Sequence, residues 1–227
     1  SGSAPLPADL WTAFRRETGH EILERYGMTE TVMMTSNPLA GARIAGSAGK
    51  PLPGIALRIA APDGTVLPQG ETGIVEVSGP NVFAGYWRAA DKTAASFRPD
   101  GYFITGDIGR FDEDGYLHLA GRASDLIISG GFNVYPREVE DVLREIEGVA
   151  DCAVIGLPHA DWGEAVAAVI ETAPGCALAE AAVIAHARAV LAPFKTPKRV
   201  LFQALPRNAM GKIEKSRLRA GLAGLFA

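Results

Sequence analysis

The stretch LAGRASDLIISGGFNVYPREVE, residues 119–140, marks a change in the character of the sequence. Before Arg122, short runs of Val, Ile and Leu lie between turn signals such as Pro-Asp-Gly, a pattern that predicts antiparallel strands in a small sheet or barrel. After Arg122, the stretch predicts a short hairpin over LIISGGFNVYP and then a helix from Pro136 to Glu147, with its proline in the first turn. We therefore expect two domains, one over residues 1–122 and one over residues 123–227.

The residues on both sides of this stretch predict an α+β fold. The C-terminal side contains, in order, strands VADCAVIGLP and EAVAAVIET, an alanine-rich helix, a strand KRVLFQAL and a terminal helix after Ile213. The N-terminal side contains a helix over Ala8–Thr18 that ends at Gly19, followed by strands in PLPGIALRIA, in TGIVEVSGP and around the hairpin signal DEDGY. The opening SGSAPLP has no initiator Met and is typical of the end of a buried strand, so we expect the chain to be a piece of a longer protein.

The composition argues against several classes of function. With 227 residues, 48% of them hydrophobic, the chain is long enough to bury a substantial core. Its net charge is −4 and its Lys and Arg residues are dispersed, so neither a nucleic-acid partner nor a membrane-surface partner is predicted. No apolar run approaches the roughly 20 residues needed to cross a bilayer. Cys152 and Cys176 lie in apolar contexts without metal-ligand spacing, which predicts buried thiols and a cytoplasmic protein.

Five segments, taken together, resemble the adenylate-forming acyl-CoA synthetase superfamily. They are, in chain order, ERYGMTE, GYWRAADKTAASF, FITGDIG, the stretch over residues 119–140, and PRNAMGKIEK. Each segment is a weak signal alone, but five in order make coincidence a poor explanation. The resemblance implies an acid–thiol ligase that uses ATP, Mg²⁺ and coenzyme A. It also implies that residues 1–122 are the C-terminal part of a large AMP-binding domain and that residues 123–227 are a smaller mobile lid.

The segment YGMTE would line the ATP site in this family. Tyr26 is expected to stack on adenine, and Gly27, followed by Met28 in the same ATP-binding run, lets the backbone approach closely. Thr29 is expected to donate to the α-phosphate, and Glu30 to hold Mg²⁺, a cation that takes oxygen ligands. Without the other segments, the same residues would be interpreted as a turn with Thr29 capping a helix.

Three further residues are matched with ATP-binding roles. Asp107 would accept hydrogen bonds from both ribose hydroxyls through its two oxygens, and Arg122 would also touch the ribose. Lys212, in PRNAMGKIEK, matches a lysine whose ammonium bridges the incoming carboxylate and the α-phosphate. The resemblance thus implies a catalytic set of Lys212, Thr29 and Glu30.

The lid carries the predicted hinge and thiol-binding residues. The family's hinge position falls on Ser124, where Asp or Lys is usual, so the residue that bears the torsion change is left open. Gly130 and Gly131 would let the thiol arm of coenzyme A pass, because a Cβ there would narrow the channel. Arg137 is a candidate contact for a CoA phosphate.

The identity of the acid depends on residues 31–54, TVMMTSNPLAGARIAGSAGKPLPG. This segment resembles that of malonyl-CoA synthetases, and Arg43 is the candidate partner of the second carboxylate of a dicarboxylate, with Ser36 adding a hydroxyl. The alternative is a medium- or long-chain fatty acyl-CoA synthetase, in which Arg43 would be a surface residue. A second alternative is a non-catalytic nucleotide- or CoA-binding remnant. Because the family's phosphate loop is not in this sequence, we expect the 227-residue chain alone to be inactive.

Overall fold

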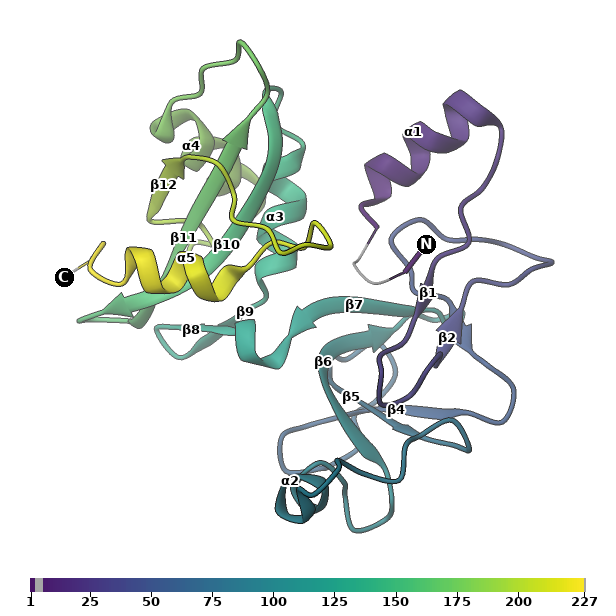
Figure 1. The fold of residues 1–227 in the computed structure, drawn as a ribbon. Helices are drawn as coiled ribbons and strands as arrows, with labels where there is room; N and C mark the ends of the chain where they lie inside the picture. Colours follow the sequence, from purple (N-terminus) through teal and green to yellow (C-terminus); the bar gives the residue numbers. More distant parts are fainter. Residues whose placement is uncertain (3–5, 227) are drawn as a thin grey trace. The chain divides into compact units, whose positions relative to one another are not determined.

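The computed structural model describes residues 1–2 and 6–226, which form two compact units, Ser1–Ala123 and Ser124–Ala227 (Figure 1). The boundary lies beside Arg122, where the sequence changes character. Each unit combines helices with sheets, so the α+β prediction is confirmed. The strand end expected in SGSAPLP falls largely on residues 3–5, outside the described part of the chain. None of the described helices is long and apolar enough to cross a membrane.

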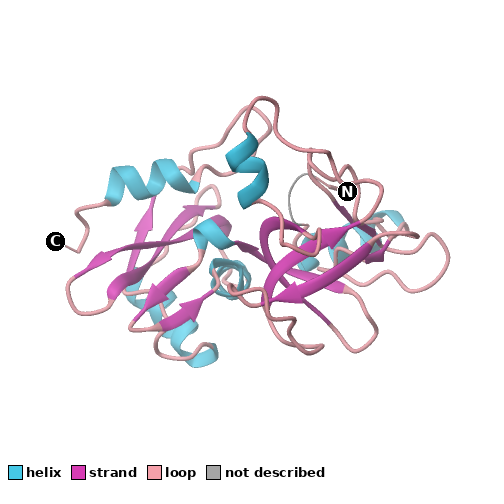
Figure 2. Ribbon diagram, turned by 90° about the horizontal axis from the view of Figure 1, so that it is seen from below, coloured by secondary structure: helices cyan, strands magenta, loops and turns pink. Residues whose placement is uncertain are grey.

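The strands of the first unit form two antiparallel sheets, and all described strands are magenta in Figure 2. The small sheet consists of β1 (Arg25–Tyr26), β2 (Thr35–Ser36) and β3 (Lys50–Pro51). The larger sheet pairs β4 (Ala56–Ala60), β5 (Gly73–Ser78), β6 (Phe103–Phe111) and β7 (Leu117–Arg122) in chain order. β4 and β7 are its edges, so the sheet is open and the barrel alternative is wrong. Helices α1 (Ala8–Thr18) and α2 (Ala90–Ala95) complete the unit, and α1 ends at Gly19 as predicted.

Side chains on both faces of β5 are buried. Val75 and Val77 are fully buried in the apolar core of the unit, and Glu76 between them is also fully buried. Its carboxylate accepts hydrogen bonds from Nε of Arg58 at 2.8 Å and from Nε of Arg98 at 2.7 Å. A carboxylate excluded from water is tolerated when it is paired in this way. Glu76 therefore links β5 to the neighbouring strand β4, which carries Arg58, and to the segment outside the sheet that carries Arg98.

The second unit is built around one mixed sheet. Its strands are β8 (Ile127–Ser129), β9 (Phe132–Val134), β10 (Val149–His159), β11 (Gly163–Thr172) and β12 (Arg199–Phe202), with β12 parallel to β11. Its helices are α3 (Pro136–Arg144), α4 (Glu180–Val190) and α5 (Lys215–Leu222), and η1 (Ala123–Asp125) spans the boundary between the units. α3 ends earlier than the predicted Glu147, because the amide of Ile146 donates to the carbonyl of Leu143 in a tighter turn.

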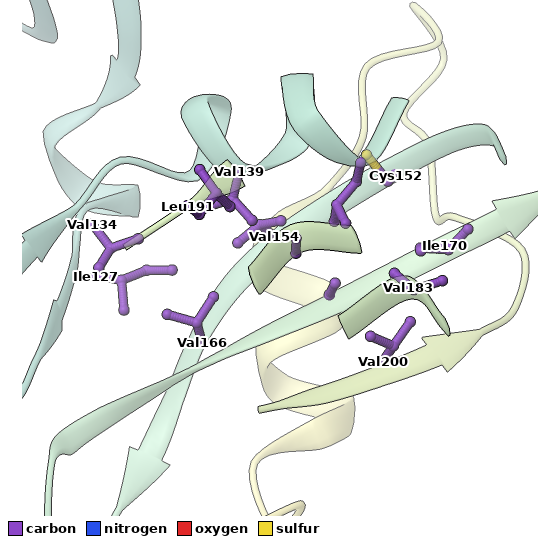
Figure 3. Packing of buried hydrophobic residues seen from close by; sticks show 13 residues of the cluster. Ile127, Val134, Val139, Cys152, Val154, Val166, Ile170, Val183, Leu191 and Val200 are labelled. Carbon is purple, nitrogen blue, oxygen red and sulfur yellow. The ribbon is translucent and has the colours of Figure 1, made fainter. Parts of the chain in front are cut away.

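Alternating residues of β10 supply two separate apolar cores. Cys152 and Val154 pack in one cluster with residues of α3 and α4 (Figure 3). Ala153 and Ile155, on the other face of the sheet, pack in a second cluster with Leu218 of α5. The period of two places helices on both faces of the sheet.

The two cysteines have different environments. Cys152 is buried, as predicted, and burial raises the pKa of its thiol to about 12. Cys176 is exposed, so the prediction of a second buried thiol is wrong. Its amide donates to the carbonyl of Ala173 in the turn that follows β11, and an apolar neighbourhood in sequence does not bury a turn residue.

Candidate functional site

The two sheets of the first unit bring Tyr26, Asp107 and Arg122 together. The antiparallel register of β6 and β7 places Asp107 directly opposite Arg122, and Nε of Arg122 lies 2.8 Å from Oδ1 of Asp107. The hydroxyl of Tyr26 donates a hydrogen bond to Oδ2 of Asp107. Thr105, two residues before Asp107, accepts from the amide of Asp107 at 3.0 Å. Both oxygens of the carboxylate are thus oriented by the protein.

Burial sets the electrostatics of this cluster. Loss of water around Tyr26 raises the pKa of its hydroxyl far above the ordinary value, and the neighbouring anion of Asp107 raises that pKa further. The hydroxyl therefore stays protonated and donates throughout the neutral range. Arg122 is more open to solvent, with its side chain 43% exposed, against 10% for Asp107. The carboxylate is therefore largely shielded from water, and the guanidinium that pairs with it is partly exposed.

Tyr26→Phe tests the contribution of this buried hydrogen bond. We expect the free energy of unfolding to fall by about 1–3 kcal/mol, because a buried charged acceptor loses one donor. Chemical denaturation of the intact protein measures the change. Tyr102→Phe is the matched control, since among the described residues the Tyr102 hydroxyl has no hydrogen-bond partner and phenylalanine keeps the ring under Arg58. It should change stability by no more than about 0.5 kcal/mol. Equal stability of both variants would contradict this assignment.

Glu30 has a partner that sequence reasoning missed. The hydroxyl of Tyr86 donates to Oε1 of Glu30 at 3.0 Å, and the amide of Phe83 donates to the carbonyl of Glu30 at 2.8 Å. Burial and the carboxylate together raise the pKa of Tyr86. Tyr86 follows Gly85 in GYWRAADKTAASF, one of the five segments that resemble the family, and its place in that segment was the available indication of a role at the site. Among the described residues, none donates a hydrogen bond to the second oxygen of Glu30, so that oxygen is available to another ligand.

The chemistry of this carboxylate fits a magnesium ion. Among residues 1–2 and 6–226, no three His, Cys, Asp or Glu side chains group as a metal site. Mg²⁺ is commonly held by one or two carboxylates together with substrate phosphates and water, so a single carboxylate such as that of Glu30 is compatible with this ion. Thr29 is exposed beside it, as a donor to a phosphate would need to be.

Gly27 and Met28 have structural roles in the first unit, one in a tight turn and the other in core packing. A Cβ on Gly27 would lie 1.9 Å from the carbonyl oxygen of Val32, so only glycine allows this turn of the chain. Met28 packs against the apolar core of the unit. Tyr26 is also part of that core, and the residue is 9% exposed. Stacking of Tyr26 on adenine stays a prediction.

Arg43 and Ser36 both have hydrogen-bond partners within the protein. Arg43 donates to the carbonyls of Glu21 at 2.7 Å, Leu39 at 3.1 Å and Pro38 at 3.3 Å. Ser36 donates to the carbonyl of Asn37 at 2.9 Å. A guanidinium has five N–H donors, so these three carbonyl bonds leave donors for a substrate carboxylate.

The remaining predicted site residues belong to the second unit, which is described by itself. Gly130 and Gly131 form the turn between β8 and β9 with φ values of 59° and 82°, which favour glycine. Ser124 is exposed in η1. Nε of Arg137 lies 3.3 Å from Oδ2 of Asp141, one turn along α3. Lys212 is exposed in the loop before α5.

Comparisons with known proteins find matches in both units, and the matches belong to the same kind of enzyme. The family model described as AMP-binding enzyme matches residues 1–87, and the model described as AMP-binding enzyme C-terminal domain matches residues 138–212. A malonate–CoA ligase of Arabidopsis thaliana is 44% identical over 98% of this chain and 38% of its own length. A feruloyl-CoA synthase of an Amycolatopsis species is 43% identical over 96% of this chain and 45% of its own length.

Solved structures match the whole chain. The crystal structure of ATP-bound MatB from Rhodopseudomonas palustris is 51% identical and has a TM-score of 0.98, covering 100% of this chain and 46% of that protein. The chain therefore spans less than half the length of the relatives that it matches.

Proposed function

The chain belongs to the AMP-binding enzyme family, and on this premise we propose that the full-length protein activates malonate with ATP and transfers the malonyl group to coenzyme A. The observation that carries the proposal is the 51% identity to ATP-bound MatB at a TM-score of 0.98. The 44% identity to a malonate–CoA ligase supports the choice of acid. Free thiols at Cys152 and Cys176 fit a reducing cytoplasm, where we place the enzyme.

The proposed reaction has two steps. In the first, a carboxylate oxygen of malonate attacks the α-phosphorus of ATP, and pyrophosphate leaves. In the second, the sulfur of the coenzyme A thiol attacks the acyl carbon, its proton passes to solvent, and AMP leaves. Both steps redistribute charge at phosphate and acyl oxygens, so placed donors are the main contribution of the protein.

The residues of the first unit bind the nucleotide in this proposal. Asp107, oriented by Tyr26 and Arg122, accepts from the ribose hydroxyls. Thr29 donates to the α-phosphate. Glu30, held by Tyr86, binds Mg²⁺, which neutralises phosphate charge when bound.

The residues of the second unit act alternately. We propose that this unit is the mobile lid and that it rotates about the segment around Ser124. In one arrangement Lys212 donates to the α-phosphate during the first step. In the other, the Gly130–Gly131 turn faces the thiol, and Arg137 contacts a CoA phosphate.

The direct test uses the full-length protein with ATP, Mg²⁺ and coenzyme A. We expect AMP and pyrophosphate to form with malonate, and mass spectrometry to detect malonyl-CoA. Competition with medium- and long-chain fatty acids at equal concentration should leave malonyl-CoA as the main product. Preference for the fatty acids would identify a fatty acyl-CoA synthetase, and nucleotide binding without turnover would identify a binding remnant. Either result would overturn the proposal.

Arg43→Ala tests the choice of a dicarboxylate. We expect kcat/KM for malonate to fall about tenfold or more relative to kcat/KM for a monocarboxylic acid of similar size, because a hydrogen bond to a charged group contributes about 1.5–3 kcal/mol. Arg110→Ala is the control, since Arg110 is exposed on β6 and should affect neither acid. An equal fall for both acids would show that Arg43 only holds its loop through the three carbonyls.

A further inference from the structure

The loop that carries Lys212 closes on a single side chain. Oδ1 of Asn208 accepts hydrogen bonds from the amides of Met210 and Lys212, both at 3.0 Å. The backbone of Asn208 also pairs with Lys212, since its amide donates to the carbonyl of Lys212 at 2.9 Å. Gly211 takes φ of 79° and donates to the carbonyl of Asn208 at 2.9 Å. The amide and the carbonyl of Lys212 are therefore both held by Asn208.

An arginine anchors this loop to the sheet. Nη2 of Arg207 donates to Oδ2 of Asp151 at 2.7 Å, and Nη1 donates to the carbonyl of Gly211 at 3.2 Å. Asp151 lies in β10, where its other oxygen accepts from the amide of Cys152 at 2.8 Å. Arg207 thereby fixes the position of Gly211, immediately before Lys212, relative to strand β10.

A buried carboxylate anchors the other end of the loop. Nζ of Lys215, at the start of α5, lies 2.6 Å from Oε1 of Glu140. Glu140 is 7% exposed in α3 and also accepts from the amide of Val154 in β10 at 2.8 Å. By contrast, the ammonium of Lys212 is exposed and forms no ion pair with a residue of the described chain. Several contacts therefore hold the backbone around Lys212, while its charged side chain is available to another partner.

We propose that Asn208 is a positioning residue for Lys212, with the Arg207–Asp151 pair as its anchor. The inference rests on the proposed function, in which Lys212 donates to the α-phosphate. A flexible loop would have to lose conformational freedom each time the ammonium met the phosphate, whereas a loop closed by Asn208 has lost it on folding. Asn208 touches no reacting atom and acts only through the placement of Lys212.

The test compares Asn208→Ala with Asn208→Asp in the full-length protein. Single-turnover formation of malonyl-AMP should slow roughly 10–100-fold in Asn208→Ala, because a displacement of about 1 Å at a catalytic group can cost about 10²-fold. Transfer of supplied malonyl-AMP to coenzyme A should stay within about twofold of the unmodified protein, which shows that the variant is folded. Asn208→Asp keeps an oxygen that accepts from both amides, so it should recover most of the lost rate. Gln203→Ala removes an exposed amide side chain of the same unit and should change neither step.

A second measurement separates positioning from stability. If Asn208 acts only through Lys212, adding Asn208→Ala to Lys212→Ala should lower adenylation no further. Normal adenylation by Asn208→Ala, no rescue by Asp, an additive loss in the double variant, or equal loss in both steps would each overturn the inference. Failure of the proposed function is distinguishable, because the unmodified protein would then form no malonyl-AMP.

Discussion

Lys212→Ala is expected to slow the formation of malonyl-AMP by on the order of 10²–10³, the usual effect of removing a preorganised donor to developing charge. The ammonium is exposed and has no ion-pair partner among the described residues. Its removal therefore leaves no carboxylate of the protein without a partner. The loop should keep its shape, because Asn208 holds the backbone of Lys212 and not its side chain. Transfer of supplied malonyl-AMP to coenzyme A should proceed at nearly the normal rate.

Single-turnover kinetics of each step in the full-length variant measure this separation. Lys195→Ala is the matched control, since Lys195 is another lysine of the same unit whose ammonium pairs with Glu138. It should slow neither step by more than a few fold, because an exposed ion pair contributes only about 0–1 kcal/mol. Equal losses in both steps of Lys212→Ala would show that this lysine serves both arrangements or the fold. The two-arrangement lid would then have to be abandoned.

Asp107→Ala is expected to lower kcat/KM for ATP by roughly 10²–10⁴. Two ribose hydroxyls each lose a charged acceptor, and a hydrogen bond to a charged group contributes about 1.5–3 kcal/mol. The substitution also removes the anion that orients the hydroxyl of Tyr26 and the guanidinium of Arg122. Thermal unfolding of the variant should therefore be recorded beside its kinetics.

Analogues of the nucleotide test the same contact from the other side. In the unmodified protein, 2′,3′-dideoxy-ATP should be a far poorer substrate than ATP, and in Asp107→Ala the two nucleotides should become nearly equal. Asp114→Ala is the control, because Asp114 is exposed in the turn between β6 and β7 and should leave the discrimination unchanged. Undiminished discrimination in Asp107→Ala would place the ribose elsewhere.

Several elements of the fold could be predicted because they depend on short-range patterns. The helix over Ala8–Thr18 ends at Gly19, whose left-handed backbone is favourable only for residues such as glycine. The segment VADCAVIGLP was predicted to be a strand, and successive residues of β10 supply the two cores on opposite faces of the sheet in the second unit. The exposure of Cys176 was not predictable from apolar neighbours, since a turn can carry such residues to the surface.

The sequence by itself determined the change in residue pattern at Arg122, the family of the chain and the types of residue that we propose to bind the nucleotide. Only the tertiary structure decided which of them meet. Tyr26 reaches Asp107 across 81 positions of the chain, and Tyr86 reaches Glu30 across 56. Tyr26 and Asp107 come from different sheets, and Glu30 and Tyr86 both lie in loops, so these pairs depend on how distant segments of the unit pack together. Local periodicity carries no information about such long-range packing, so the partners of these residues became visible only in the folded chain.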